Sequence, residues 1–555
     1  MRKQAFLLLP LLALIGVGIG LWQAGLFGGG KSYNVLLISI DSLRADRLGL
    51  YGHRAEYVDT PVSPNLDSLA AEGVAFDNAW STTSWTLPAH MAMLTGLTDG
   101  SHGVIQDDFR LDPLRQTLAA QFQQAGYQTA GYFSGPYLDP RHGFDRGFEE
   151  YRSGMMSNQE VDQHLKRLQA YRAQNNLPGL DKAQVQAFLD RKSHWDITSP
   201  RINRHGLGFL ERNGGKEPFF LFLHYFDVHY DHIPETAEEG LEKAFDPEYR
   251  GNFPAENWYF SEQVRDAKGR RLIGERDLHH ILANYDAEIH WVDRHIGQIL
   301  DKLKEMELYE NTIICITSDH GDEFFDRGSI GHRSHLHHEL LKIPLVLRVP
   351  DGLTPPGKRI AELAKIYDIG PTLLDYAGVD PLPHAEGRSL RSLIDDQEGS
   401  ELGAFCRILS PVNIRGDIDI TDGWRDERYT VIRKLIPDRQ RLRREGKVYL
   451  DPKLSVQRQP IYLVYDRVQD PKELQPLKPE DPRYRQAVEA FCRDYQLAER
   501  DRALLPQSPL QNRYAPQYSE DAKAAFDSLG YVTVEEEGQR RHPPVAPLPA
   551  PCETP

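Results

Sequence analysis

A threonine and three potential metal ligands could together do chemistry on an anionic ester. Thr86 lies where a loop meets a helical segment, and Asp41 and the pair Asp319-His320 each follow an apolar run. Carboxylates and imidazoles bind divalent cations, and a bound cation lowers the pKa of an oxygen from about 16 to about 7. We therefore predict one divalent metal ion at Asp41, Asp319 and His320, beside Thr86 as the nucleophile.

Each of these residues also has an ordinary structural explanation. Thr86 could be a helix N-cap two residues before Pro88, because threonine is a favoured capping residue. Asp41 could be a turn residue, and Asp319-His320 could belong to a solvated loop. Their joint occurrence after two buried strands favours the metal site.

Further histidines could contact the transferred group and the leaving oxygen. His229 follows the apolar run 219–223, and His332 stands next to Gly331. Imidazole can donate hydrogen bonds to developing negative charge, so both are candidate catalytic residues. The region 331–339 holds four histidines, and we expect the others to lie mostly at the surface.

Buried strands and amphipathic helices alternate along the chain and must position these residues. The runs 34–40 and 312–317 are continuously apolar, as strands buried on both faces are. Helical patterns occur at 114–125 and 283–306, and further apolar runs at 219–223 and 345–347. This alternation predicts an α/β fold with a mostly parallel sheet, whose carboxyl edge carries the site.

The remaining segments suggest a main domain with appendages. We predict a catalytic domain over 31–400 with insertions at about 152–200 and 234–276, where the composition turns polar. Shorter strand patterns at 429–435 and 461–465 predict a C-terminal subdomain over 401–534. The proline-rich end, 535–555, is predicted to be a disordered tail.

Charge and cysteine content exclude several classes of protein. The chain has 65 basic and 81 acidic residues, a net charge of -16, and no concentrated basic stripe. A nucleic-acid-binding domain is therefore not expected. Four cysteines without a CxxC pair exclude a disulfide scaffold and a cysteine zinc site, and leave one bridge open.

The N-terminal segment, 1–30, predicts export. Arg2 and Lys3 precede an apolar stretch over 5–27 that is long enough to cross a membrane as a helix. A cleaved signal peptide and a retained membrane anchor both remain open. Either one predicts a periplasmic or other extracytoplasmic location.

Several motifs together resemble the sulfatase family of the alkaline phosphatase superfamily, along nearly all of the chain. They are Asn34-to-Gly52 with Asp41, Thr60-to-Asp67, Tyr285-to-Ile289, Ser318-to-Glu323, Asp368-to-Leu374, and Tyr465-Asp466 with Asp470-Pro471 and Glu473. The resemblance implies an alkaline-phosphatase-like sandwich: a large, mostly parallel sheet flanked by helices, plus a small C-terminal α+β subdomain. It also implies one divalent metal and a covalent intermediate.

Carried over residue by residue, the resemblance assigns roles to the site. Asp41, Thr86, Asp319 and His320 become metal ligands, Thr86 is also the nucleophile, and His229 and His332 contact the anionic group. Ser42 stands where many sulfatases have another acidic ligand. The identity of the metal, whether calcium, magnesium, manganese or zinc, therefore stays open.

The nucleophile motif departs from the sulfatase signature Cys-x-Pro-x-Arg, which here reads Thr86-Leu87-Pro88-Ala89-His90. Threonine cannot become formylglycine, so that cofactor is not expected. The block 86–103 is similar to the nucleophile region of nucleotide pyrophosphatase/phosphodiesterases, in which threonine attacks phosphorus. His90 is accordingly a catalytic candidate, while Asp227 followed by Asp231 fits the second metal site of those enzymes poorly and leaves a second metal open.

We therefore predict a metal-dependent hydrolase that acts on an anionic ester through a covalent Thr86 intermediate. Phosphodiester, phosphonate or phosphate esters are expected ahead of sulfate esters. The alternatives are a true sulfatase, a phosphoryl transferase to a lipid or glycan acceptor, and a catalytically degenerate binding protein.

Overall fold

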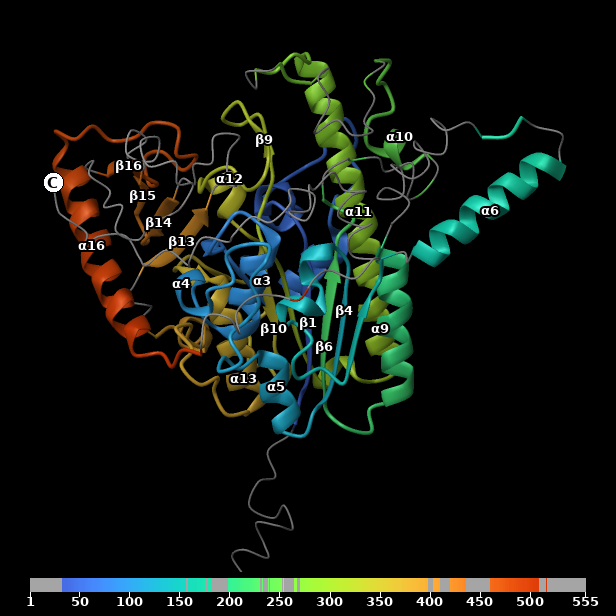
Figure 1. Ribbon diagram of the computed structural model, residues 1–555, viewed down its shortest axis with the longest axis horizontal. Coiled ribbons are helices and arrows are strands. Elements are labelled where there is room, and N and C mark those ends of the chain that lie inside the picture. The colour runs from blue at the N-terminus through green and yellow to red at the C-terminus, as the bar shows by residue number, and fades with distance from the viewer. Residues whose placement is uncertain are drawn as a thin grey trace, which may run out of the picture.

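A large central sheet organises the molecule. The computed structural model describes residues 32–155, 158–174, 178–180, 198–229, 232, 238, 240–251, 253, 264–266, 270–397, 403–409, 420–435, 460–508 and 516. Eight strands form the sheet in the order β11-β2-β10-β7-β1-β6-β4-β5 (Figure 1). Their bounds are β1 Asn34–Ile40, β2 Val74–Phe76, β4 Gln128–Phe133, β5 Glu150–Ser153, β6 Phe219–Tyr225, β7 Thr312–Ser318, β10 Leu345–Arg348 and β11 Lys358–Ile360.

The three central strands are apolar because both of their faces are buried. β1 pairs in parallel with β6 on one side and with β7 on the other. Successive side chains of a strand point to opposite faces. Accordingly, Val35 and Leu37 join one hydrophobic cluster, while Leu36 and Ile38 join the other.

Helices cover both faces and complete the two clusters. One face packs against α3 (Thr86–Thr95), α5 (Leu118–Gln124) and α13 (Ile369–Ala377). The other packs against α2 (Pro64–Glu72), α9 (Ser199–Asn213) and α11 (Glu275–Glu305). Figure 1 shows α3 and α5 in front of the sheet, and α9 and α11 along its right-hand side. This confirms the predicted α/β class.

A second, antiparallel sheet lies at the C-terminal side of the molecule. It contains β13 (Ala404–Leu409), β14 (Ile420–Arg425), β15 (Tyr429–Leu435) and β16 (Ile461–Asp466), and α16 (Pro482–Ala503) packs on it. Arg425 of β14 donates to the Leu336 carbonyl of the main body and forms a buried ion pair with Glu473. The small C-terminal sheet therefore joins the main body through a polar contact close to the loop that follows β9.

The remaining strands and α-helices of the described residues complete the order. They are β3 (Ala79–Trp80), β8 (Glu323–Phe324), β9 (Ile330–Gly331), β12 (Ala364–Lys365), α4 (Asp99–His102), α6 (Asn158–Gln174), α10 (Leu241–Phe245), α12 (His338–Leu341) and α14 (Arg391–Ile394). The polar helix α6, in the first predicted insertion, projects away from the body in Figure 1.

Three predicted elements differ from the observed ones. The helix expected over 114–125 begins only at Leu118, because Thr117 caps it by accepting from the Ala120 N–H. The helix expected from residue 283 begins at Glu275. The run 345–347 forms β10 as expected, but this strand is antiparallel to both of its neighbours.

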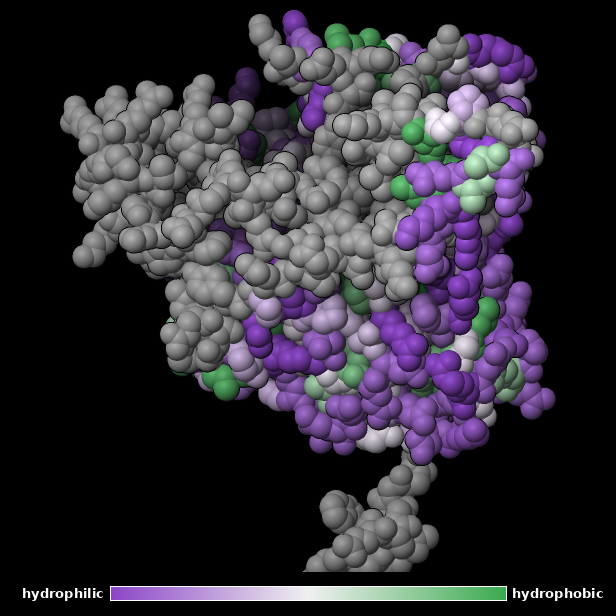
Figure 2. All heavy atoms as spheres, turned by 45° about the vertical axis from the view of Figure 1, so that its right-hand side comes forward, coloured by the Kyte–Doolittle hydropathy of each residue, from purple (hydrophilic) through white to green (hydrophobic). Residues whose placement is uncertain are grey.

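Other expectations fall on parts of the chain that are not described. The apolar stretch 5–27, parts of both insertions and the tail 535–555 are among them. Within the described ranges, no helix combines the length and apolar character needed to span a membrane. On the face shown in Figure 2, hydrophilic residues dominate the described surface, and hydrophobic ones are scattered between them.

Truncating a central core side chain should destabilise the main body. Leu223 of β6 is fully buried between its neighbouring strands and the helical face of the second cluster. We expect Leu223→Ala to lower the free energy of unfolding by about 2–5 kcal/mol, measured by urea denaturation. Leu504→Ala is the matched control, because that leucine is 79% exposed. Equal effects of the two substitutions would contradict this packing.

Candidate active site

The site forms where β1 and β7 end on the face that α3 covers. Asp41 follows directly after β1, and Asp319 follows directly after β7. Both lie an even number of positions after strand residues that pack against α3, so their side chains point to the same face of the sheet. Because β1 and β7 are parallel neighbours, their carboxyl ends meet at one edge. The strand register therefore brings these two carboxylates together.

Thr86 and His320 complete the group. The Thr86 hydroxyl donates to Asp41 Oδ2 at 3.3 Å and lies 3.4 Å from His320 Nε2. One ligand atom from each of Asp41, Asp319 and His320 lies within 4.8 Å of the others. All four side chains are buried. The structure thus places the predicted nucleophile beside the predicted metal ligands.

Thr86 is the first residue of α3 and not its N-cap. Trp85 occupies the cap position and makes no side-chain capping bond. The hydroxyl of Thr86 instead turns toward Asp41 and His320. The capping explanation is therefore wrong, since the hydroxyl is engaged with the acidic strand ends and not with its own helix.

The hydrogen bonding of His320 leaves its inner nitrogen available. Nδ1 donates to the Gly321 carbonyl at 2.8 Å, so the lone pair of the neutral ring lies on Nε2, next to Thr86. Burial lowers the pKa of His320 to about 3 and keeps the ring neutral. A side chain at Gly321 would collide with the Glu339 backbone, at 2.1 Å from its carbonyl oxygen. Glycine there allows the close approach that fixes this loop.

The two carboxylates lack a compensating cation among the described residues of the site. Burial and the charge of Asp41 raise the pKa of Asp319 well above its usual range. Burial also acts to raise the pKa of Asp41, but the adjacent His224, 3.3 Å away, outweighs it and lowers that pKa. Asp319 Oδ2 is buried without a hydrogen bond. This donor set fits a divalent cation.

Ser42 orients the two carboxylates. Its backbone N–H donates to Asp319 Oδ1 at 3.1 Å, and its hydroxyl donates to Asp41 Oδ1 at 3.0 Å. Ser42 makes these bonds from a left-handed backbone, with φ 57°. Ser42 thereby fixes the Oδ1 atoms of Asp41 and Asp319, and their Oδ2 atoms lie on the side of the site.

His229 and His332 lie next to this group. The ring centroids of His332 and His320 are 4.6 Å apart, and those of His332 and His229 are 4.9 Å apart. His332 Nδ1 lies 3.1 Å from Asp322 Oδ1, a contact that orients the ring. Phe226 stacks on His229 at 4.3 Å. The two predicted histidines therefore lie on the same side of the site as the predicted metal ligand His320.

His90 is buried behind the nucleophile. Its Nδ1 donates to the Thr86 carbonyl at 2.9 Å, and its Nε2 accepts from the Ser39 hydroxyl at 2.9 Å. Burial, with help from the nearby His224, lowers the pKa of His90 to about 3. These contacts tie the first turn of α3 to β1, which makes His90 a positioning residue.

His224 is a site residue that the sequence reasoning missed. It is fully buried in β6, and Nε2 lies 3.3 Å from Asp41 Oδ2. Its ring meets that of His90 edge-on at 4.7 Å. A polar residue near the end of an otherwise apolar buried strand was the available signal. Ser39, its register partner on β1, carries the same signal.

The carboxylate of Asp227, the other acidic residue considered for a second metal, has a structural role. It accepts from the N–H groups of Thr198 and Ser199 at 2.6 and 2.9 Å, and from the Trp291 indole at 3.1 Å. Both oxygens therefore serve the start of α9. Asp227 is therefore not available as a ligand of a second metal. Asp231, the other proposed ligand, lies outside the described residues.

This fold and this edge define an α/β class in which a buried threonine hydroxyl stands beside two carboxylates and a histidine. The sulfatase family profile matches residues 33–379. The chain therefore belongs to the sulfatase family, whose members are hydrolases of ester bonds that bind a divalent metal.

Curated relatives and solved structures agree with this assignment. An arylsulfatase from Clostridium perfringens is 28% identical, with 66% of this chain and 79% of that protein covered. A multifunctional alkaline phosphatase superfamily protein from Trinickia caryophylli is 26% identical, with 66% and 78% covered. The phosphonate monoester hydrolase of Agrobacterium radiobacter superposes with a TM-score of 0.60 at 20% identity, covering 88% of this chain and 100% of that one. This last likeness shows the fold.

Replacing Asp227 should affect stability and not metal content. Asp227→Ala removes the acceptor for the first N–H groups of α9, and we expect a loss of about 1–2 kcal/mol in the free energy of unfolding. Asp227→Asn keeps one acceptor oxygen and should lose less. Urea denaturation and elemental analysis of both variants test this. A drop in bound metal in either variant would instead make Asp227 a metal ligand.

Proposed function

We propose that this protein hydrolyses anionic esters through a covalent intermediate on Thr86, with phosphodiester, phosphonate or phosphate esters preferred over sulfate esters. The observation that carries the proposal is the position of the Thr86 hydroxyl. It starts a helix, is buried, and lies between Asp41 Oδ2 and His320 Nε2. A structural threonine has no need of such partners.

Asp41, Asp319 and His320, with the Thr86 oxygen, would hold one divalent metal. When bound, a divalent cation neutralises the two carboxylates and makes an alcohol oxygen acidic enough to react near neutral pH. Ser42 orients the carboxylates, and the Gly321 carbonyl fixes the ring of His320. These contacts hold the ligands in place before substrate arrives.

The chain's own residues account for the remaining steps. The Thr86 oxygen loses its proton to water and forms a bond to phosphorus, while the bond from phosphorus to the leaving alcohol breaks. His332, oriented by Asp322, gives a proton to that alcohol, and His229 donates to the oxygens of the transferred group. Water then attacks phosphorus and gives a proton to His332, while the bond from phosphorus to the Thr86 oxygen breaks and that oxygen takes back a proton from water.

The choice of phosphorus over sulfur follows from the nucleophile. In formylglycine sulfatases the hydrated aldehyde carries a second hydroxyl that expels sulfate from the enzyme. A sulfated Thr86 has no such hydroxyl, whereas a phosphorylated threonine can be hydrolysed at phosphorus by activated water. The 26% identical relative named as a multifunctional alkaline phosphatase superfamily protein is consistent with such a broader range of esters.

A true sulfatase activity is the second candidate. It is favoured by the relatives named as sulfatases, including the 28% identical arylsulfatase. Transfer to a lipid or glycan acceptor would use the same covalent step with an alcohol in place of water.

We further propose that segment 5–27 exports the chain. We also propose that the catalytic domain of the protein ends near residue 400.

Substitution of Thr86 tests the nucleophile. We expect Thr86→Ala to lose activity on bis(p-nitrophenyl) phosphate by about a thousandfold or more, while fold and metal content persist. Thr86→Ser, which keeps the hydroxyl, should retain measurable turnover. Initial rates on that diester, on p-nitrophenyl phosphate and on p-nitrophenyl sulfate compare the ester classes. Full activity of Thr86→Ala, or sulfate as the best substrate, would contradict the proposal.

Substitution of Asp319 tests the cation. Without a metal, Asp319→Asn should be at least as stable as the wild type, because it removes one of two adjacent buried carboxyls and keeps an acceptor for the Ser42 N–H. With metal, the wild type should gain about 2.7 kcal/mol at ~100 times Kd, and the variant should not share this gain. Thermal unfolding with EDTA and with calcium, magnesium, manganese or zinc measures both. Equal stabilisation of both proteins by every cation would rule the site out.

A further inference from the structure

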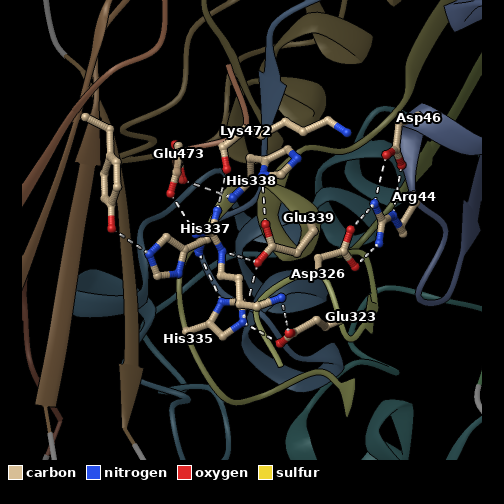
Figure 3. A network of polar contacts seen from close by, with 12 residues as sticks. Arg44, Asp46, Glu323, Asp326, His335, His337, His338, Glu339, Lys472 and Glu473 are labelled. Atoms are coloured by element: carbon tan, nitrogen blue, oxygen red, sulfur yellow. Dashed lines mark hydrogen bonds and ion pairs between the residues drawn. The ribbon is translucent and has the colours of Figure 1, made fainter. Parts of the chain in front are cut away.

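A second cluster of potential metal ligands lies between β9 and α12. One ligand atom from each of His335, His337 and Glu339 lies within 4.8 Å of the others. We expected these histidines at the surface, and that was wrong: His337 is buried, and the side chains of His335 and His338 are only 16% and 13% exposed. Figure 3 shows the cluster, with Glu323 and Glu473 at its edges.

The spacing of the two histidines explains why their rings converge. His335 and Leu336 have no helical hydrogen bonding, and α12 begins only at His338. His337 has an extended backbone, with φ -89° and ψ 173°, and in an extended segment side chains two residues apart point to the same side. The ring centroids of His335 and His337 are 4.8 Å apart.

Each histidine has a partner on its outer nitrogen. His337 Nε2 lies 3.2 Å from the Tyr465 hydroxyl of β16, and His337 Nδ1 is buried without a hydrogen bond. His335 Nε2 lies 2.7 Å from Glu323 Oε2, and its Nδ1 accepts a long hydrogen bond of 3.3 Å from the His337 backbone N–H, which an ion would have to replace. The Arg327 and Ser329 N–H groups both donate to Glu323 Oε1, so this carboxylate is fixed. Metal-bound histidines usually have such an outer partner, which sets the tautomer.

Glu339 offers one oxygen in addition. Arg327 Nε donates to its Oε1 at 2.5 Å. Its Oε2 is buried without a hydrogen bond, although His338 Nδ1 lies 2.7 Å away in an unfavourable direction. In this network Arg327 pairs with Glu339 and Arg425 pairs with Glu473. Glu323 pairs with His335.

We propose that His335, His337 and Glu339 bind a structural zinc ion, at a site separate from that of Asp41, Asp319 and His320. Two imidazoles and a carboxylate are typical zinc donors. The ion would satisfy the buried His337 Nδ1 and Glu339 Oε2. Through Tyr465 it ties the loop that carries His332 to the C-terminal sheet.

Zinc stoichiometry of the full-length protein tests this proposal. After incubation with zinc and gel filtration, elemental analysis should give about two ions per chain for the wild type. His335→Gln and His337→Gln should each hold about one, as should the Asp41→Asn, Asp319→Asn double variant. Tyr465→Phe is the matched control, because it removes the partner of His337 but no ligand, and it should keep both ions.

Anomalous diffraction at the zinc edge from wild-type crystals locates the ions without depending on any variant. The proposal expects a peak among His335, His337 and Glu339. Its absence, a wild-type zinc count in His337→Gln, or loss of the second ion during gel filtration would each overturn the structural site. The readout is metal content, so an inactive Thr86 would not affect it.

Discussion

The burial of two neighbouring carboxylates is the constraint on which the site depends. Asp41 and Asp319 have no exposure to solvent, and the parallel pairing of β1 with β7 makes their meeting unavoidable. Two buried like charges repel strongly when water cannot screen them. This repulsion, together with burial, raises the pKa of Asp319. A divalent cation removes it, and the same cation is what a threonine needs to become a nucleophile.

In the described part of the site, buried histidines surround the carboxylates. Burial keeps His90, His229 and His320 uncharged by lowering their pKa values. The family signature has an arginine where this chain has His90, and His224 lies beside it. A neutral ring that bonds to Ser39 and to the Thr86 carbonyl holds α3 in place without adding positive charge. We infer that charge balance at this site is left to the metal.

The sequence predicted the parts of the site that follow from strand ends. Continuous apolar runs located β1 and β7, and the residues after them had to share an edge. His224 escaped prediction because one histidine in a buried strand can equally be a satisfied core residue. The direction of β10 was also not predictable, since an apolar run has the same composition in either direction.

Side-chain partners decided the remaining differences. Asp227 could serve either a metal or a helix start, and the distant residues Thr198 and Trp291 settle which. The histidines after Gly331 read as polar surface, but Tyr465 and Glu323 hold two of them inside. Both outcomes depend on contacts between residues far apart in the chain, which local patterns cannot reveal.

Trapping the covalent intermediate tests the central claim most directly. The protein would be mixed with excess bis(p-nitrophenyl) phosphate, quenched in acid within the first turnover, digested and analysed by mass spectrometry. The account predicts a substrate-derived phosphoryl group on the oxygen of Thr86. Turnover with that peptide unmodified throughout, or with the group on another residue, would contradict it.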